Sequence, residues 1–180
     1  MHRIKQIMMT VITVMWMVVI FLFSADPAEE SSEKSMGIGY AVADFFVADF
    51  QEWSSQERME YVEKIEYPIR KAGHGMEYAV LGFFAMATTL LWKEKYKGKW
   101  TLFFFVWGIT ILYAASDEIH QLFVPGRSCQ ITDVGIDSLG ALLGIFSFLI
   151  GRRVVNRLFP HKDFCDKLKK EKELKDRNGA

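Results

Sequence analysis

Four stretches of the sequence are almost free of charge and alternate with charged segments: 7–23, 75–92, 100–115 and 134–150. Only Glu77 and Asp137 interrupt them. A helix rises about 1.5 Å per residue, so helices of this length cover much of a hydrocarbon layer of about 30 Å. Soluble helices usually carry a charged stripe, and the first and third stretches have none. The pattern therefore predicts an all-α integral membrane bundle of four transmembrane helices.

The first loop, residues 24–73, has a pattern of its own. Apolar residues recur there at helical spacing: Val42, Phe45, Phe46, Phe50 and Trp53. Ser54 and Glu57 then form a capping-box pattern, which predicts the start of a second helix. The polar faces of both helices are acidic, with Asp44, Asp49, Glu52, Glu60 and Glu63. Because anionic lipid repels acidic faces, we expect a partly helical extracellular loop with two short amphipathic helices that pack over the spans.

Composition excludes several other classes of protein. The 180 residues are 51% hydrophobic with a mean hydropathy of +0.09, which excludes a disordered chain. Lys and Arg number 22, as do Asp and Glu, so nothing draws the chain toward nucleic acid. Two cysteines outside any zinc-type spacing exclude a disulfide scaffold. We expect one membrane domain over 1–155 and a charged cytoplasmic tail over 156–180.

The distribution of Lys and Arg predicts the orientation. Residues 24–73 contain eleven acids and five bases, whereas 152–180 contain ten bases and five acids. Basic residues also precede the first stretch and separate the second from the third. We therefore expect a multi-pass cell-membrane protein with both termini in the cytoplasm, Cys129 outside and Cys165 inside. The first stretch has features of a signal peptide, but no small-x-small cleavage pattern follows it, so we expect it to be retained.

With this orientation, the ionisable and polar residues of the spans fall at their outer ends. Such groups are costly in a bilayer and usually face other helices or a water-filled cavity. The candidates come from the second, third and fourth spans and from the loop after the third: Arg70, His74, Glu77, Asp117, Glu118, His120, Gln121, Arg127, Asp133 and Asp137. Ser24 and Asp26 close the first span on the same side.

Helical spacing places these candidates on shared faces. The groups are His74 with Glu77 and Tyr78, Asp117 with His120 and Gln121, and Asp133 with Asp137. The last face continues through Gly140 and Gly144, a pattern that lets another helix approach closely. Pro125 and Gly126 predict a turn that folds Arg127 back over the polar residues. The sequence therefore predicts a polar cluster under the outer loops.

Four segments carry a recognisable set of motifs: WMVVIFLFS from Trp16 to Ser24, RKAGHGMEYAVLG from Arg70 to Gly82, SDEIHQLFVPGRSCQITDV from Ser116 to Val134, and DSLGALLG from Asp137 to Gly144. With these segments the chain resembles the VanZ-like family, whose founding member is associated with teicoplanin resistance. The resemblance implies a small multi-spanning membrane protein linked to glycopeptide tolerance. It also implies that Asp137 stands where the family commonly has Asn.

One hypothesis for the cluster is recognition of a membrane lipid or a lipid-linked cell-wall precursor. Arg70 and Arg127 would bind phosphate or carboxylate in an outward-facing polar pocket. The other ligand-binding candidates are Glu118, Gln121, Asp133 and Asp137. The aromatic residues expected to line the apolar part are Tyr78, Tyr113 and Phe123.

A second hypothesis is a membrane-embedded hydrolase or transferase. The catalytic candidates are His120 or His74 as general base, oriented by Asp117 or Glu77, with Arg127 stabilising negative charge. Two histidines and several carboxylates could also hold a divalent ion, but their spacing is a weak signal, so no metal ligand and no cofactor are assigned. The remaining alternative is an interhelical network of ion pairs and hydrogen bonds that only stabilises the bundle.

Overall fold

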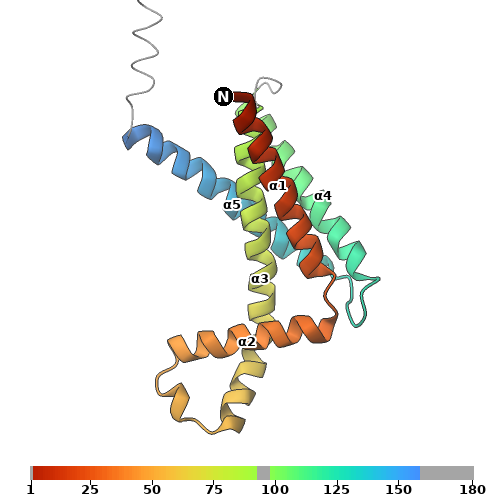
Figure 1. Cartoon of the computed structure of the whole chain (residues 1–180), viewed down its shortest axis with the longest axis vertical. Coiled ribbons are helices and arrows are strands. Elements are labelled where there is room, and N and C mark those ends of the chain that lie inside the picture. The colour runs from red at the N-terminus through yellow and green to blue at the C-terminus, as the bar shows by residue number, and fades with distance from the viewer. Residues whose placement is uncertain (1, 93–97, 159–180) are drawn as a thin grey trace, which may run out of the picture. The chain divides into compact units, whose positions relative to one another are not determined.

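The computed structural model describes residues 2–92 and 98–158, and helices are the only regular elements in that part of the chain (Figure 1). The elements are α1 (His2–Ser24), α2 (Ala28–Phe46), the short 3₁₀ helix η1 (Phe50–Glu52), α3 (Ser55–Leu91), α4 (Lys99–Gln121) and α5 (Ile131–Leu158). This confirms the all-α class. The chain forms two compact units, Met1–Phe146 and Ser147–Ala180, and the packing and the candidate site described below lie in the first. The predicted tail lies almost wholly outside the described residues.

Three helices are long and apolar enough to cross a membrane: α1, residues Trp100–Gln121 of α4, and α5. They contain the first, third and fourth predicted spans. The second predicted span, 75–92, corresponds to the C-terminal half of α3, which is not among the three. This half carries Glu77 and two threonines, Thr88 and Thr89, so it is less apolar than the others. Its membrane crossing stays a prediction.

The first predicted helix of the outer segment is wrong in its boundaries. Its five apolar residues do not share one helix, because α2 ends at Phe46 and Asp49 then takes a left-handed φ of 58°. The turn brings Phe50 back toward α3, where its side chain is buried. The helical spacing of apolar residues therefore continues past the end of α2, across a turn at Asp49 that the sequence pattern did not reveal.

The second predicted helix begins as expected but is not short. The Ser54 hydroxyl accepts a hydrogen bond from the Glu57 N–H at 3.3 Å, and the Glu57 carboxylate accepts one from the Ser54 N–H at 2.9 Å. This confirms the capping box. The helix then continues through Pro68 to Leu91, so one helix contains both the outer segment and the second predicted span.

A small apolar core, the outer core, joins α2 to the N-terminal half of α3. Its buried residues are Ala43, Phe50 and Val62, and the residues packed around them are Met36, Tyr40, Val47, Trp53, Tyr61 and Ile65. Gly39 lets the two helices approach, because a Cβ there would lie 2.8 Å from Cγ1 of Val62. The five predicted acidic residues are exposed. The principal partner of α2 is thus the N-terminal half of α3 rather than the predicted spans.

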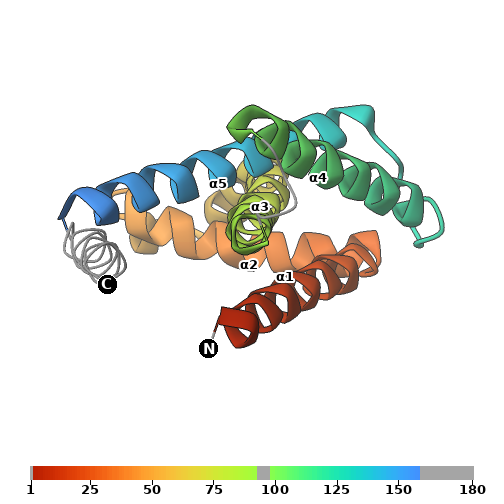
Figure 2. The same cartoon turned by 90° about the horizontal axis from the view of Figure 1, so that it is seen from above.

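A second apolar core lies between α1, α4, the C-terminal half of α3 and the start of α5. Its buried residues are Ile20, Tyr78, Leu81, Ala114 and Ala141. Seen from above, α3 stands end-on with α1 on one side and α4 and the start of α5 on the other (Figure 2). The C-terminal half of α3 is therefore the central element of this region.

The contact between α3 and α5 is made backbone to backbone. A Cβ at Gly140 would overlap the carbonyl oxygen of Gly75, and a Cβ at Gly144 would overlap that of Ala79. The buried residues of α5 are Asp133, Asp137, Gly140, Ala141, Gly144 and Ile145. Burial thus confirms the single face that the spacing predicted, with acids at its start and small residues after them.

Candidate functional site

Four helices meet at one end of this helical region (Figure 1). Helices α1 and α4 end there, α5 begins there, and α3 passes through at about residues 70–78. The buried Ser24, at the end of α1, donates a hydrogen bond of 2.6 Å to Oδ2 of the buried Asp117 of α4. The sequence therefore placed these helix ends together correctly.

Arg127 ties the loop after α4 to the same place. Its Nε donates to the backbone carbonyl of Asp26 at 3.1 Å, and its Nη1 donates to Oε1 of Gln121 at 3.5 Å. Nε2 of Gln121 in turn donates to Oδ2 of Asp117 at 3.3 Å. Gly126 has a φ of 73° and forms the turn that the sequence predicted. Arg127 thus folds back toward the cluster, as the turn pattern implied.

Two acids connect α5 to the cluster. Oε2 of Glu118 accepts a hydrogen bond of 2.8 Å from the backbone N–H of Gln130, immediately before α5. Asp133, in the first turn of α5, forms an ion pair with Lys71 of α3 through both carboxylate oxygens. Glu118 and Asp133 are both buried, so both acids have a partner that compensates for lost water.

Lys71 is a site residue that the sequence reading missed. It lies three residues before His74 and seven before Tyr78, so all three share a helical face, and that spacing was a usable signal. The reading chose Arg70 instead. Nε of Arg70 lies 3.8 Å from Oε1 of Glu66, and its guanidinium lies over the ring of Tyr67. Arg70 thus has partners on its own helix, whereas Lys71 bridges to α5.

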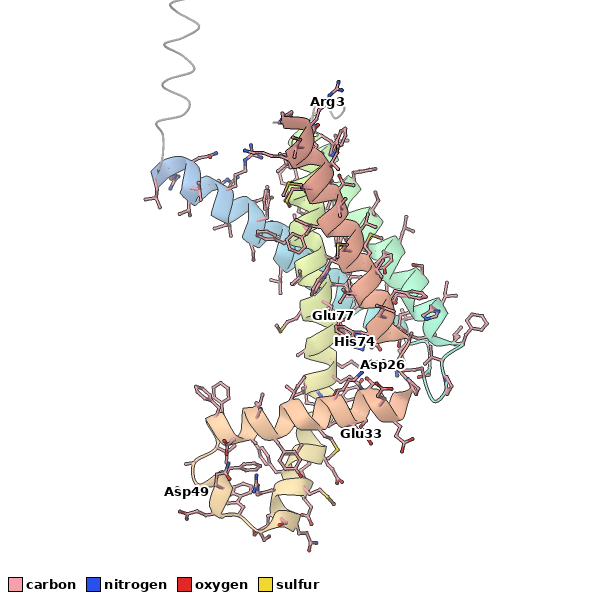
Figure 3. The ribbon with its side chains drawn as sticks, viewed as in Figure 1. Arg3, Asp26, Glu33, Asp49, His74 and Glu77 are labelled. Carbon is pink, nitrogen blue, oxygen red and sulfur yellow. The ribbon has the colours of Figure 1, made fainter. Side chains whose placement is uncertain are left out.

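His74 and Glu77 lie on the stretch of α3 beside Asp26 (Figure 3). The backbone carbonyl of Glu77 accepts a hydrogen bond of 2.9 Å from Nε1 of Trp16, which ties α3 to α1. Within the described residues, no hydrogen bond joins the His74 and Glu77 side chains. The structure therefore brings both candidates to the cluster without pairing them.

His120 is held by a ring contact. Its imidazole stacks on Phe21 of α1 with a centroid distance of 4.2 Å. Nε2 of His120 is buried and has no hydrogen-bond partner in the described part of the chain. Ser24 and Gln121, rather than His120, are hydrogen-bonded to Asp117. The histidine is thus fixed in place by packing instead of by a carboxylate.

Five buried side-chain atoms of the cluster lack a hydrogen-bond partner among the described residues: Glu77 Oε2, Tyr78 Oη, Asp117 Oδ1, His120 Nε2 and Asp137 Oδ1. Tyr78 is 0% exposed and Asp137 is 1% exposed. Glu77, Asp117 and Asp137 are all close enough to Tyr78 to interact with it electrostatically. A buried polar group without a partner costs about 1–3 kcal/mol. The unpaired atoms therefore mark a place where water or a ligand would be stabilising.

The VanZ/LLP1 family model matches residues 9–152. The chain belongs to the VanZ/LLP1 family. All ten candidate residues, from Arg70 to Asp137, lie within the matched segment. No curated protein and no solved structure matches the chain. The role of the cluster in this VanZ/LLP1 protein has to be inferred from its own residues.

Two basic side chains of this VanZ/LLP1 protein that lie outside the predicted spans, His74 and Arg127, have lowered pKa values. Burial lowers the pKa of His74 to about 4, and the positive charge of Arg127 acts in the same direction. Burial also lowers the pKa of Arg127, with Arg70 adding repulsion. His74 is therefore neutral at neutral pH and a weak proton acceptor, which makes it a poor candidate for a general base.

The three aromatic candidates of this VanZ/LLP1 protein lie in different surroundings. The rings of Tyr78 and Tyr113 lie 6.1 Å apart, and the Tyr113 hydroxyl donates to the backbone carbonyl of Met17 at 2.6 Å. Phe123 is 81% exposed, so its predicted place in the lining is wrong.

In residues 2–92 and 98–158, no group of three or more His, Cys, Asp or Glu side chains is arranged to hold a metal ion.

Proposed function

We propose that this VanZ/LLP1 protein crosses the cell membrane four times, with both termini in the cytoplasm and the polar cluster toward the outer leaflet. The cluster then binds the polar part of a cell-envelope lipid or of a lipid-linked precursor. Through this binding the protein contributes to glycopeptide tolerance of the teicoplanin type. Family membership, the apolar helices and the distribution of Lys and Arg support this proposal.

The observation that carries the binding role is the set of unpaired buried atoms from α3, α4 and α5. In a structural network without bound water, each unpaired group would cost about 1–3 kcal/mol, so several unpaired carboxylate oxygens close together favour a place that holds water or a ligand. A ligand that donates hydrogen bonds to Glu77, Asp117 and Asp137 removes this cost. The unsatisfied groups therefore favour recognition over a purely structural role.

The chemistry of the cluster restricts the ligand. The unpaired atoms are mostly acceptors, so they fit hydroxyl, amide or ammonium groups. Arg127 lies at the loop side of the cluster and is suited to a phosphate or carboxylate of the same molecule. A saccharide or peptide headgroup attached to a lipid through phosphate carries both kinds of group.

Two substitutions test the binding role. His120→Ala and Arg127→Ala should leave the level of folded protein in mild detergent near that of the parent and should abolish teicoplanin tolerance. Ile119→Ala is the matched control, because Ile119 is the exposed neighbour of His120 on α4. Tolerance that persists in both well-folded variants would overturn the proposal. A loss of tolerance that follows a loss of folded protein would favour the structural network.

An enzyme is the second candidate, favoured by the free Nε2 of the immobilised His120. In this alternative Nε2 takes a proton from water or from a substrate hydroxyl, and Arg127 stabilises the negative charge that develops. Asp137→Asn separates recognition from a mechanism in which Asp137 carries a proton or binds a metal, because Asn keeps the shape but cannot carry a proton. Recognition predicts a protein at least as stable as the parent with tolerance retained. A stable variant without tolerance would favour catalysis or metal binding.

Cysteine labelling tests the orientation. Cys129 is exposed in the loop between α4 and α5, and Cys165 lies outside the described residues. A membrane-impermeant maleimide added to sealed cells should label Cys129 and leave Cys165 unlabelled. Labelling of Cys165 would overturn the orientation and, with it, the outward position of the cluster.

A further inference from the structure

Helix α2 has two opposed apolar faces. Met36, Tyr40 and Val47 pack into the outer core. Residues two positions away from these are also apolar but are exposed: Ile38 56%, Val42 36% and Phe45 82%. Positions two apart on a helix differ by about 200° in direction, so Ile38 and Val42 lie opposite Met36 and Tyr40. Phe45, seven residues after Ile38, lies on the same side as Ile38. Phe46, the last residue of α2, is 77% exposed and adds apolar surface at the same end of the helix. We call Ile38, Val42, Phe45 and Phe46 the exposed stripe.

The exposed stripe points toward the candidate spans. Residues Phe50 to Val62, which cover the packed face, lie on the side of α2 away from α1 and α4 (Figure 1). Since the stripe is on the opposite side, it faces the direction in which α1 and α4 extend. Glu33, seven residues before Tyr40 and so on the packed side, lies on the side away from α1 (Figure 3).

Chain connectivity fixes the depth of α2. Helix α1 ends at Ser24 and α2 begins at Ala28, so three residues connect them. Three residues reach about 10 Å at most. The two views agree that α2 runs across the direction of α1 instead of continuing it (Figures 1 and 2). If α1 crosses the bilayer, α2 therefore lies along the membrane surface.

The outer surface of α1 continues the apolar character of the stripe. Only 11% of its most apolar window is buried inside the protein. Its large exposed side chains include Val18 and Phe21, near the end that leads to α2. The exposed surface of α1 and the exposed stripe of α2 are both apolar and point the same way. The acyl chains of one lipid leaflet could cover both surfaces together.

We propose that α2 is an interfacial helix whose exposed stripe inserts into the acyl chains of the leaflet at which α1 ends. The exposed polar residues of α2 are mostly acidic, including Glu29, Glu30 and Asp44, so insertion is driven by apolar burial and suits zwitterionic lipid. Because α2 also packs on α3, this insertion fixes the outer segment and the polar cluster at the depth of the lipid headgroups. The inference rests on the membrane crossing of α1, not on the ligand of the cluster.

Fluorescence quenching in vesicles tests this placement. The full chain with Cys129→Ser and Cys165→Ser receives one new cysteine, at Val42 on the stripe or at Glu33 on the opposite side. Each is labelled with a polarity-sensitive dye and reconstituted in phosphatidylcholine with brominated acyl chains. A third label at Val11, exposed on α1, reports the spans. We expect strong quenching at positions 11 and 42, weak quenching at 33, and no change on adding salt.

Each other outcome overturns the inference in a recognisable way. Quenching at position 42 as weak as at position 33 would place the stripe in water. A blue-shifted but unquenched dye at position 42 would mean that protein, either a second copy or a partner, covers the stripe. Absent quenching at position 11 would remove the membrane crossing of α1, on which both this inference and the proposed topology depend.

Discussion

The two halves of α3 pack by different means. The N-terminal half buries Val62 against Phe50 and Ala43, and aromatic rings surround them, with Trp53 and Tyr61 edge to face at 5.7 Å. The C-terminal half contacts α5 through glycine and alanine, so closely that the backbones touch. One continuous helix thus packs on α2 through large side chains and on α5 through almost none.

The proposed topology, with water around the N-terminal half and lipid around the C-terminal half, accounts for the contrast. In water, removing apolar surface stabilises a core, and large aromatic side chains supply the most surface. In lipid this driving force is absent, and helices associate through close backbone approach between small residues. The change from Phe50 and Val62 to Gly75 and Gly82 therefore places the proposed membrane boundary near residue 70. Lys71 and His74 lie at this boundary.

The largest effect is expected from one methyl group added to the α3–α5 contact, which tests whether this contact depends on small residues. In Gly144→Ala the new Cβ overlaps the Ala79 carbonyl, so the two helices must separate, at a cost of about 3 kcal/mol or more. We expect little folded protein by size-exclusion chromatography in mild detergent. Gly135→Ala on the same helix has open space around it and should be neutral or slightly stabilising. Equal yields for both variants would contradict the close contact.

A cavity in the outer core tests whether the two halves are energetically separate. Phe50→Ala should lower the local free energy of unfolding by about 3 kcal/mol, because Phe50 is fully buried. Hydrogen exchange should accelerate in α2 and in the start of α3 but not around Tyr78 and Leu81. Acceleration of equal size in both regions would show that α3 unfolds as one unit.

The sequence predicted the membrane part better than the outer part, for a physical reason. Long apolar runs and the spacing of Asp133, Asp137, Gly140 and Gly144 are local signals, and burial confirms them. The outer segment depends on a left-handed Asp49, which no local apolar pattern reveals. Prediction therefore extended one helix through a turn and left the stripe of α2 unrecognised.

The candidate site shows the same division between local and nonlocal information. The cluster of polar residues could be predicted from helical spacing and from the Pro125–Gly126 turn, because both signals belong to a single helix or loop. The pairing of Lys71 with Asp133 was not predicted, because it depends on which helix lies opposite α3. Which atoms of Asp117 and His120 are paired likewise depends on the side chains that other helices bring close: Oδ2 of Asp117 has Ser24 of α1, whereas Oδ1 of Asp117 and Nε2 of His120 have no partner among the described residues.

Loss of the Lys71–Asp133 pair at the boundary should have an intermediate effect. Lys71→Met leaves the Asp133 carboxylate buried without its partner and should cost about 2 kcal/mol, measured by thermal unfolding in detergent. Adding Asp133→Asn should restore most of the loss, since no charge then remains unpaired. Lys34→Met is the control, because Lys34 pairs with Asp26 and Glu30 at an exposed position and should show no measurable change. A double variant no better than Lys71→Met would exclude this account.

The smallest expected effect concerns the first turn of α3, which lies farthest from the α5 contact. Ser54→Ala removes the capping box and should destabilise the outer core by about 1 kcal/mol at neutral pH, seen as faster hydrogen exchange around Val62. Ser55→Ala, one residue later, is the control. Hydrogen bonds from the Ser54 hydroxyl and N–H hold the pKa of Glu57 below its usual value.

That shift gives the effect a pH dependence with a defined sign. The stabilisation from Glu57 is fully present above the pKa of an unfolded glutamate, about 4.3, and is lost as the pH falls through the lower value of the folded protein. The difference between the parent and Ser54→Ala should therefore shrink below about pH 4 and stay constant above pH about 6. A difference that persists unchanged at low pH would mean that the Ser54 hydroxyl alone stabilises the helix start.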